Sequence, residues 1–186
     1  MAGFRQKLAK ASQAAQSLLC VGLDPDPKLM AIPDILDFNR AVVDATKDLV
    51  CAYKPNMAFY EAQGSAGIIA LEATVAYIRD QAPDGIVLGD GKRGDIGSTA
   101  EGYAEAYLSA AAPVSVDALT VQPYLGRDSL QPFLDRCESN GRGNSRRVGC
   151  KHPKRASRRH PNQGPNNSPG SPNQPHPAKS TALSCR

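Results

Sequence analysis

The chain has 186 residues, the length of one ordinary domain, and its 41% of hydrophobic residues would suffice for a buried core. Its net charge of +4 averages two unlike parts, because residues 1–140 carry 12 basic and 18 acidic side chains while residues 141–186 carry 10 basic and none acidic. No apolar stretch approaches the roughly 18 residues of a membrane helix, so we expect no membrane partner.

The five cysteines lie far apart and form no CxxC pair. Their spacing predicts neither a zinc site nor a disulfide framework, which favours reduced thiols and a cytoplasmic protein. The segment before Asp24 contains basic residues and no acidic ones, a composition that is also found in transit peptides. The only apolar run nearby is, however, too short for a signal sequence. A plain opening helix is therefore the favoured interpretation.

The hydrophobic pattern predicts short strands alternating with helices. Apolar runs bounded by proline, glycine or aspartate predict strands at 18–23, 51–56, 85–90 and 117–122, and helical spacing predicts helices at 3–17, 34–50, 65–81, 95–111 and 129–138. This alternation is typical of an α/β protein with a parallel sheet that is buried on both faces.

Charged residues lie at the carboxyl ends of three of the predicted strands. Asp24, Lys54, Asp90 and Lys92 all come immediately after an apolar run. Ligands of parallel α/β sheets bind beyond the carboxyl ends of the strands, whether the sheet is open or closed into a barrel. We therefore expect these side chains to form the functional site.

The hexapeptide from Asp90 to Asp95, DGKRGD, places two carboxylates and an ammonium at a strand end. Residues 90 and 92 should project to one side of the strand, and Asp95 is a candidate helix N-cap. Alone, the hexapeptide is equally typical of a solvated loop. With Lys54 on the neighbouring strand, the alternating charges of Lys54, Asp90, Lys92 and Asp95 could all stay ionised in a half-buried cleft, which favours a catalytic site.

The segment 88–100, LGDGKRGDIGSTA, resembles the signature of the orotidine 5′-phosphate decarboxylase family. Segments 21–27 (VGLDPDP), 53–61 (YKPNMAFYE) and 119–126 (LTVQPYLG) agree in order and spacing with the longer bacterial branch of that family. The resemblance covers about residues 1–143. It implies a (β/α)8 TIM barrel, of which this chain would supply about four βα units, an incomplete barrel.

The resemblance implies an enzyme that converts orotidine 5′-phosphate to uridine 5′-phosphate and CO₂ in pyrimidine synthesis, with no metal and no organic cofactor. By the same resemblance Lys92 donates a proton to the ring carbon that loses CO₂, and Asp90 faces the substrate carboxylate. Lys54 contacts the ribose and anchors the charge array, while Asp24 accepts a hydrogen bond from a ribose hydroxyl.

The resemblance also implies a homodimer. Ile96 belongs to the implied substrate-binding set, together with two residues that in this family reach the active site of the other subunit, Asp95 and Thr99. The nucleotide substrate and a second copy of the chain are therefore the expected partners.

The chain departs from the family after residue 143. A family member would continue with a fifth strand, whose Ser touches the pyrimidine, and later an Arg that grips the phosphate, whereas residues 141–186 are basic and rich in Pro, Asn and Ser. This composition predicts a disordered tail. The abrupt change suggests a frameshift or a mispredicted coding region. We therefore expect exposed sheet edges and impaired activity.

Three alternatives remain open. A hexulose-phosphate synthase would have the same architecture, but it would require a metal-binding Glu and Asp and no lysine at position 54. The chain could be an inactive truncated product. The basic tail could bind nucleic acid, although it lacks aromatic residues for stacking and offers only nonspecific attraction.

Overall fold

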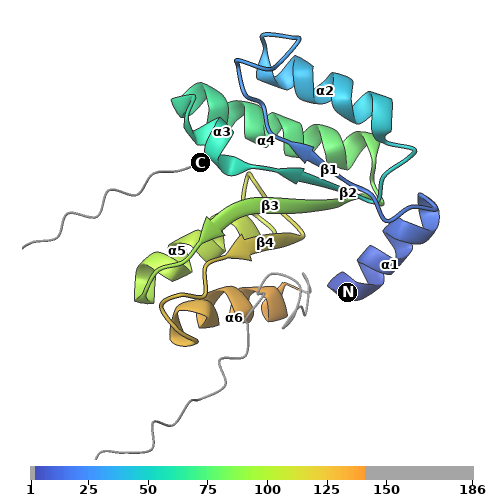
Figure 1. Ribbon diagram of the computed structural model, residues 1–186. Coiled ribbons are helices and arrows are strands. Elements are labelled where there is room, and N and C mark those ends of the chain that lie inside the picture. Colours follow the sequence, from blue (N-terminus) through green and yellow to red (C-terminus); the bar gives the residue numbers. More distant parts are fainter. Residues whose placement is uncertain (1–2, 141–186) are drawn as a thin grey trace, which may run out of the picture. The chain divides into compact units, whose positions relative to one another are not determined.

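The computed structural model describes residues 3–140, and the predicted disordered, basic segment 141–186 lies outside the described residues. Four parallel strands form one sheet in chain order, which confirms the predicted parallel architecture (Figure 1). They are β1 (Cys20–Leu23), β2 (Ala52–Pro55), β3 (Ile86–Arg93) and β4 (Ala118–Val121). In the register of the sheet, Gly22 lies opposite Lys54 and Leu88 lies opposite Ala118.

The helices follow the predicted order. They are α1 (Phe4–Ala14), α2 (Ile35–Thr46), α3 (Met57–Glu61), α4 (Gly64–Gln81), α5 (Gly97–Leu108), the 3₁₀ turn η1 (Asp128–Leu130) and α6 (Gln131–Ser139). The short α3 was not predicted, because its five residues are too few to show a helical period. β3 also runs three residues beyond the predicted end at Asp90.

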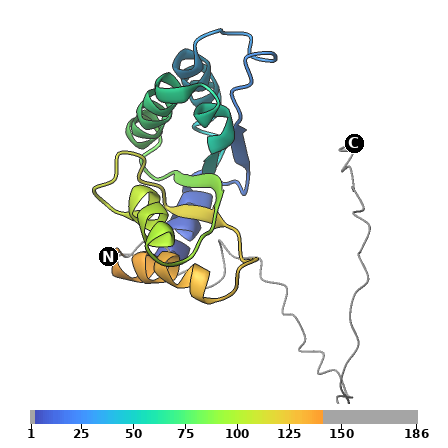
Figure 2. The same ribbon diagram turned by 90° about the vertical axis from the view of Figure 1, so that its left-hand side faces the viewer.

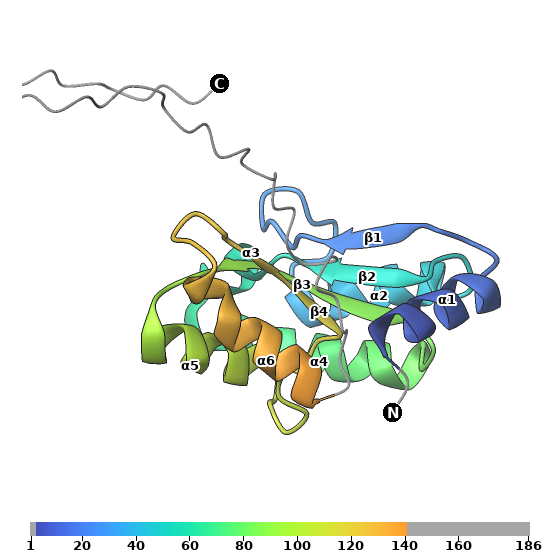
Figure 3. The ribbon, with the colours of Figure 1, turned by 90° about the horizontal axis from the view of Figure 1, so that it is seen from below.

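Helices α2 to α6 cover one face of the sheet, as Figure 3 shows from below. The core between them holds Tyr53, Val87 and Leu119 from the strands, packed against apolar residues of every covering helix. Strand alternation produces this layer, since successive side chains point to opposite faces. In β1, for example, Leu23 is fully buried against the helices while Cys20 and Gly22 are exposed.

Helix α1 packs at the end where the strands begin (Figure 3). Its buried Phe4 and Ala11 contact a second apolar cluster that contains Ala52, Ile86 and Ala118, residues at the starts of β2, β3 and β4. The predicted opening helix is thus part of the folded core.

A buried ion cluster fixes α1 to this end of the sheet. Asp117, 1% exposed, lies between Lys7 of α1, whose Nζ is 3.1 Å from Oδ1, and Arg79 of α4, whose Nη1 is 2.7 Å from Oδ2. The Val87 backbone N–H also donates to Oδ2, at 2.9 Å. Burial acts to raise the pKa of Asp117, but the Arg79 charge, the Val87 hydrogen bond and Lys7 lower it below its ordinary value.

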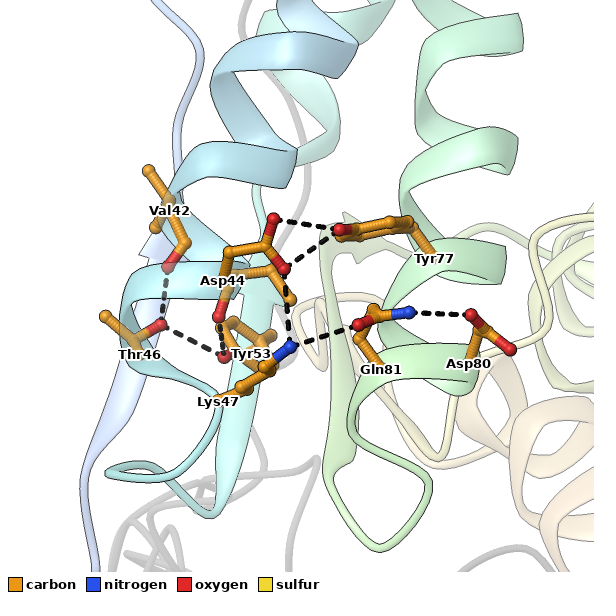
Figure 4. A network of polar contacts seen from close by, with 9 residues as sticks. Val42, Asp44, Thr46, Lys47, Tyr53, Tyr77, Asp80 and Gln81 are labelled. Atoms are coloured by element: carbon orange, nitrogen blue, oxygen red, sulfur yellow. Dashed lines mark hydrogen bonds and ion pairs between the residues drawn. The ribbon is translucent and has the colours of Figure 1, made fainter.

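A polar network connects the C-terminal parts of α2 and α4 (Figure 4). The Tyr77 hydroxyl lies 2.9 Å from both carboxylate oxygens of Asp44, and Lys47 donates to Gln81 at 3.1 Å. Beside them the Thr46 hydroxyl donates to the Val42 carbonyl at 2.7 Å and lies 3.0 Å from the Tyr53 hydroxyl. These contacts hold two helices and β2 together at a distance from the carboxyl ends of the strands.

Within residues 3–140, β1 and β4 each pair with one strand only. Leu18 and Leu19, directly before β1, are 88% and 64% exposed. Such unpaired edges match the expectation drawn from an incomplete barrel. No helix in this part of the chain is long and apolar enough to cross a membrane.

Candidate active site

The carboxyl ends of β2, β3 and β4 bring three charged side chains and one hydroxyl together. Lys54 lies in β2, Asp90 and Lys92 lie in β3, and Thr120 lies in β4. Because the strands are parallel neighbours, their carboxyl ends meet at one edge of the sheet, the end that faces the viewer in Figure 2. An additional bridge between Asn56 and Asp90 extends the pairing of β2 and β3 to this point.

Asp90 is the centre of the group. Its Oδ2 lies 3.1 Å from the Lys54 Nζ, and its Oδ1 lies 2.8 Å from the Lys92 Nζ. The Thr120 hydroxyl donates to the same Oδ1 at 2.9 Å. The side chain of Asp90 is only 13% exposed, whereas Lys54 and Lys92 are 35% and 67% exposed. The carboxylate is therefore held between two ammonium groups, of which the Lys92 group is exposed to solvent.

These contacts keep Asp90 ionised. Burial alone would raise the pKa of its carboxyl, but hydrogen bonds from Lys92, Lys54 and Thr120 outweigh burial and lower the pKa to about 2. The predicted alternation of opposite charges is thus present for Lys54, Asp90 and Lys92.

Lys92 has an unusual backbone. Its φ is +47°, in the left-handed region that non-glycine residues adopt at a cost of about 1–2 kcal/mol. The register between β3 and β4 shifts between Gly89 and Arg93, and the Lys92 N–H donates to the Thr120 hydroxyl at 2.9 Å. Asp90 and Lys92 do meet, as the two-residue spacing predicts, but through a bulge and not through regular strand alternation.

The residues after Lys92 are tightly fixed. The Gln122 N–H donates to the Arg93 carbonyl at 2.6 Å, and a Cβ on Gly94 would lie only 2.7 Å from the Gln122 carbonyl oxygen. The Arg93 guanidinium pairs with Glu61 and lies over the ring of Tyr103 at 5.3 Å. Contacts on both sides of the strand therefore hold the backbone that carries Lys92.

Asp24 follows β1 and is exposed. Its Oδ1 lies 3.7 Å from the position that a Cβ on Gly22 would occupy, and Gly22 is the register partner of Lys54. Asp24 thus lies over the strand next to Lys54, at the same end of the sheet. No ion pair connects it to the Asp90 group within residues 3–140.

Asp95, Ile96 and Thr99 lie at the start of α5 and do not join the Asp90 group. Asp95 makes no ion pair with any residue that the structure describes, and its Oδ1 accepts the Ile96 N–H at 2.8 Å. The expectation that Asp95 is the N-cap is wrong: the N-cap is Ile96, because the helix begins at Gly97, two residues later than predicted. Ile96 is 65% exposed and Thr99 is exposed.

The sequence pattern did not identify two residues that contribute to this region. Thr120 touches both Asp90 and Lys92, and Arg93 fixes the strand end from the helix side. The signal for Thr120 was available, since it is a polar residue near the end of the predicted strand 117–122. Its role depends on the bulge in β3, which no periodicity indicates.

The arrangement provides a fixed anion beside a proton-carrying ammonium. Asp90 can repel or orient a charged ligand, and Lys92, the most exposed of the three charges, can reach a ligand and donate a proton. Among the described residues, no three His, Cys, Asp or Glu side chains cluster closely enough to hold a metal ion.

Comparison with known proteins places this geometry in a family. The orotidine 5′-phosphate decarboxylase / HUMPS family matches residues 17–157. An orotidine 5′-phosphate decarboxylase of Herpetosiphon aurantiacus is 53% identical over 143 residues, which are 73% of this chain and 51% of the relative. The decarboxylase of Parabacteroides distasonis is 48% identical over 136 residues, 70% of this chain and 48% of the relative.

Solved structures agree. A Streptomyces avermitilis protein assigned as an orotidine 5′-phosphate decarboxylase superposes with a TM-score of 0.71 at 41% identity, covering 77% of this chain and 52% of that protein. The Leishmania donovani OMP decarboxylase gives a TM-score of 0.61 at 36% identity, covering 72% and 49%. The chain spans about half the length of the relatives it matches. With its four βα units of the TIM-barrel type, it belongs to the orotidine 5′-phosphate decarboxylase / HUMPS family.

Proposed function

We propose that the Lys54, Asp90 and Lys92 group is the chemical centre of an orotidine 5′-phosphate decarboxylase, which releases CO₂ and leaves uridine 5′-phosphate. The observation that carries the proposal is a carboxylate, 13% exposed, held at 3.1 and 2.8 Å between two ammonium groups at the carboxyl end of a parallel sheet. That end of the sheet is where enzymes of this architecture place their chemistry.

Asp90 acts on the substrate carboxylate. Two like charges about 4 Å apart repel each other by roughly 4 kcal/mol at an effective dielectric constant near 20, and loss of CO₂ relieves that repulsion. The repulsion requires an ionised Asp90, and the lowered pKa of about 2 supports this.

Lys92 completes the reaction. As the bond between the ring carbon and the carboxylate carbon breaks, its electron pair stays on the ring carbon, where the ammonium stabilises the developing charge. A proton from the Lys92 Nζ then forms the new C–H bond. The contact with Asp90 at 2.8 Å holds the Lys92 Nζ at the site.

Lys54 and Asp24 bind the ribose in this proposal. Lys54 lies 3.1 Å from Asp90, on the strand next to it, and Asp24 follows the strand beyond. The hexulose-phosphate synthase alternative is not favoured, because that reaction would not require a lysine at position 54 and the structure uses Lys54 as a partner of Asp90.

A homodimer is part of the proposal. Asp95, Ile96 and Thr99 lie at the start of α5. Asp95 makes no ion pair with the Asp90 group of its own chain, and Ile96 and Thr99 are exposed, which fits a role in the site of a second subunit. Tyr124, 89% exposed after β4, is a further apolar side chain at this end of the sheet. The thiols of Cys20 and Cys51 are not in a disulfide, which suits a cytoplasmic location.

The direct test follows the loss of orotidine 5′-phosphate absorbance with the purified 186-residue chain. Lys92→Ala should abolish any turnover, whereas Lys10→Ala, a matched loss of an exposed lysine at the opposite end of the sheet, should leave it unchanged. We expect slow turnover, since the chain covers about half of its relatives' length and remote binding contacts lower the barrier at the reacting centre.

A chimera with a full-length relative tests the proposed site independently of the segments that this chain does not match. Residues 1–140 of this protein would replace the matching part of the Herpetosiphon aurantiacus decarboxylase. The proposal predicts robust turnover that falls at least about 1,000-fold in Lys92→Ala, the loss of both proton transfer and charge stabilisation. A folded chimera with Lys92-independent turnover would contradict it.

A further inference from the structure

Thr120 is the one side chain of the described residues that bonds both to the carboxylate of Asp90 and to the backbone of Lys92. Its hydroxyl donates to the Asp90 Oδ1 at 2.9 Å and accepts from the Lys92 N–H at 2.9 Å. A threonine hydroxyl has one proton and two lone pairs, so these two bonds define its direction: amide to hydroxyl to carboxylate.

We propose that Thr120 is a positioning residue, whose hydroxyl holds Lys92 in its left-handed conformation and sets the Lys92 ammonium against Asp90. Its catalytic meaning rests on the function proposed above. The hydroxyl belongs to β4, so the neighbouring strand, and not the strand that carries the lysine, fixes the geometry.

The backbone of Lys92 explains why such a contact is needed. A φ of +47° is unfavourable for lysine, and residues in this state persist only where the surroundings fix them. The bulge removes regular pairing between Gly89 and Arg93, which leaves the Lys92 N–H without a strand partner. The Thr120 hydroxyl supplies the acceptor.

The hydroxyl also contacts the atom of Asp90 that Lys92 contacts. It donates to the Asp90 Oδ1, which accepts this bond at 2.9 Å. The Lys92 Nζ lies 2.8 Å from the same oxygen, so the hydroxyl and the ammonium converge on one atom. Hydrogen bonds linked in this way strengthen one another.

The test compares Thr120→Val, which keeps the shape and removes the hydroxyl, with Thr120→Ser, which keeps the hydroxyl. In the full 186-residue chain, amide hydrogen exchange by NMR should be at least tenfold faster for Lys92 in Thr120→Val and close to the wild-type rate in Thr120→Ser. Thr46→Val is the matched control, since it loses two hydroxyl contacts away from the site and should leave the Lys92 amide unchanged.

Steady-state kinetics add a second readout in the decarboxylase chimera. Thr120→Val should lower kcat at least tenfold and change KM less than twofold, because the hydroxyl positions the proton donor without touching substrate, and Thr120→Ser should restore most of kcat. A wild-type Lys92 exchange rate in Thr120→Val, or a Thr120→Ser variant that behaves like Thr120→Val, would overturn the proposal. A chimera without turnover would count against the proposed function alone, since the exchange experiment does not need activity.

Discussion

Two aspartates hold clusters of cations at opposite ends of the same sheet. Asp90, at the carboxyl end, binds Lys54, Lys92 and a hydroxyl, while Asp117, at the amino end, binds Lys7, Arg79 and a backbone N–H. Both carboxyls have a lowered pKa. Similar chemistry thus occurs twice, and the difference lies in what each cluster contacts.

The Asp117 cluster links elements. The Asp117 side chain is 2% exposed and connects α1, α4 and the start of β3, and its cations Lys7 and Arg79 are 43% and 33% exposed. The Asp90 cluster keeps one cation, Lys92, 67% exposed. The comparison shows that the two clusters differ in degree of burial: the central carboxylate is 2% exposed for Asp117 and 13% exposed for Asp90, and Lys92 is the most exposed cation of the two clusters.

The largest expected effect is on folding at the amino end. Asp117→Ala should lower the free energy of unfolding by about 3 kcal/mol, because it leaves Arg79 and the Val87 N–H without their buried acceptor. Asp90→Ala should cost about 1 kcal/mol, since its lysines can turn to water. Urea denaturation of both variants measures the contrast, and equal losses would remove the distinction between the two ends.

A smaller effect is expected from the backbone at the carboxyl end. Gly94→Ala places a Cβ 2.7 Å from the Gln122 carbonyl oxygen and should destabilise the protein by about 2 kcal/mol. Gly102→Ala is the control, because nothing lies within 4 Å of a Cβ at that position in α5, and it should stabilise by about 0.5–1 kcal/mol. Thermal unfolding of the pair gives the answer. Matching shifts in Tm would show that the end of β3 is not tightly fixed.

Acid should weaken the fold by a comparable amount. Both carboxyls have a lower pKa in the folded protein than in the unfolded chain, because the cations and hydrogen bonds around them outweigh burial. Their contribution to stability is therefore present above the ordinary aspartate pKa of about 4 and is lost as the pH falls through each folded pKa, which is about 2 for Asp90. Urea midpoints at pH 4, 3 and 2 should fall less steeply in Asp90→Asn and in Asp117→Asn than in the wild type.

The smallest effect concerns an exposed pair near the amino end. Lys10 and Asp84 lie 2.8 Å apart with side chains 71% and 49% exposed. Lys10→Ala should change the free energy of unfolding by less than about 0.5 kcal/mol. A loss as large as that of Asp117→Ala would mean that the number of charges at this end, and not their burial, determines stability.

Much of the fold could be predicted from the sequence. Apolar runs followed by Pro25, Pro55 and Pro123 indicated where strands end. Lys54 and Asp90 were expected at one end of the sheet, where they do meet, because parallel strands bring their carboxyl ends together. The resemblance to the decarboxylase family is confirmed by the comparisons. The roles of individual site residues stay predictions.

The remaining features of the site depend on tertiary contacts, which produce no hydrophobic periodicity in the sequence. The positive φ of Lys92 and the register shift of β3 against β4 have no signal in the sequence, so Thr120 could be recognised as a polar residue near a strand end but its double contact could not. No periodicity indicated the late start of α5. The same applies to Asp117, which was assigned only to the start of a strand and is in fact the centre of the amino-end cluster.

The most direct test of the central claim is a ¹³C NMR titration of the aspartate carboxyls in the 186-residue chain. The account predicts that Asp90 titrates near pH 2 and that Lys54→Met raises its pKa while leaving Asp117 unchanged. An Asp90 that titrates at the ordinary value of aspartate, or that does not respond to Lys54→Met, would contradict the claim that these four strands assemble the charge array.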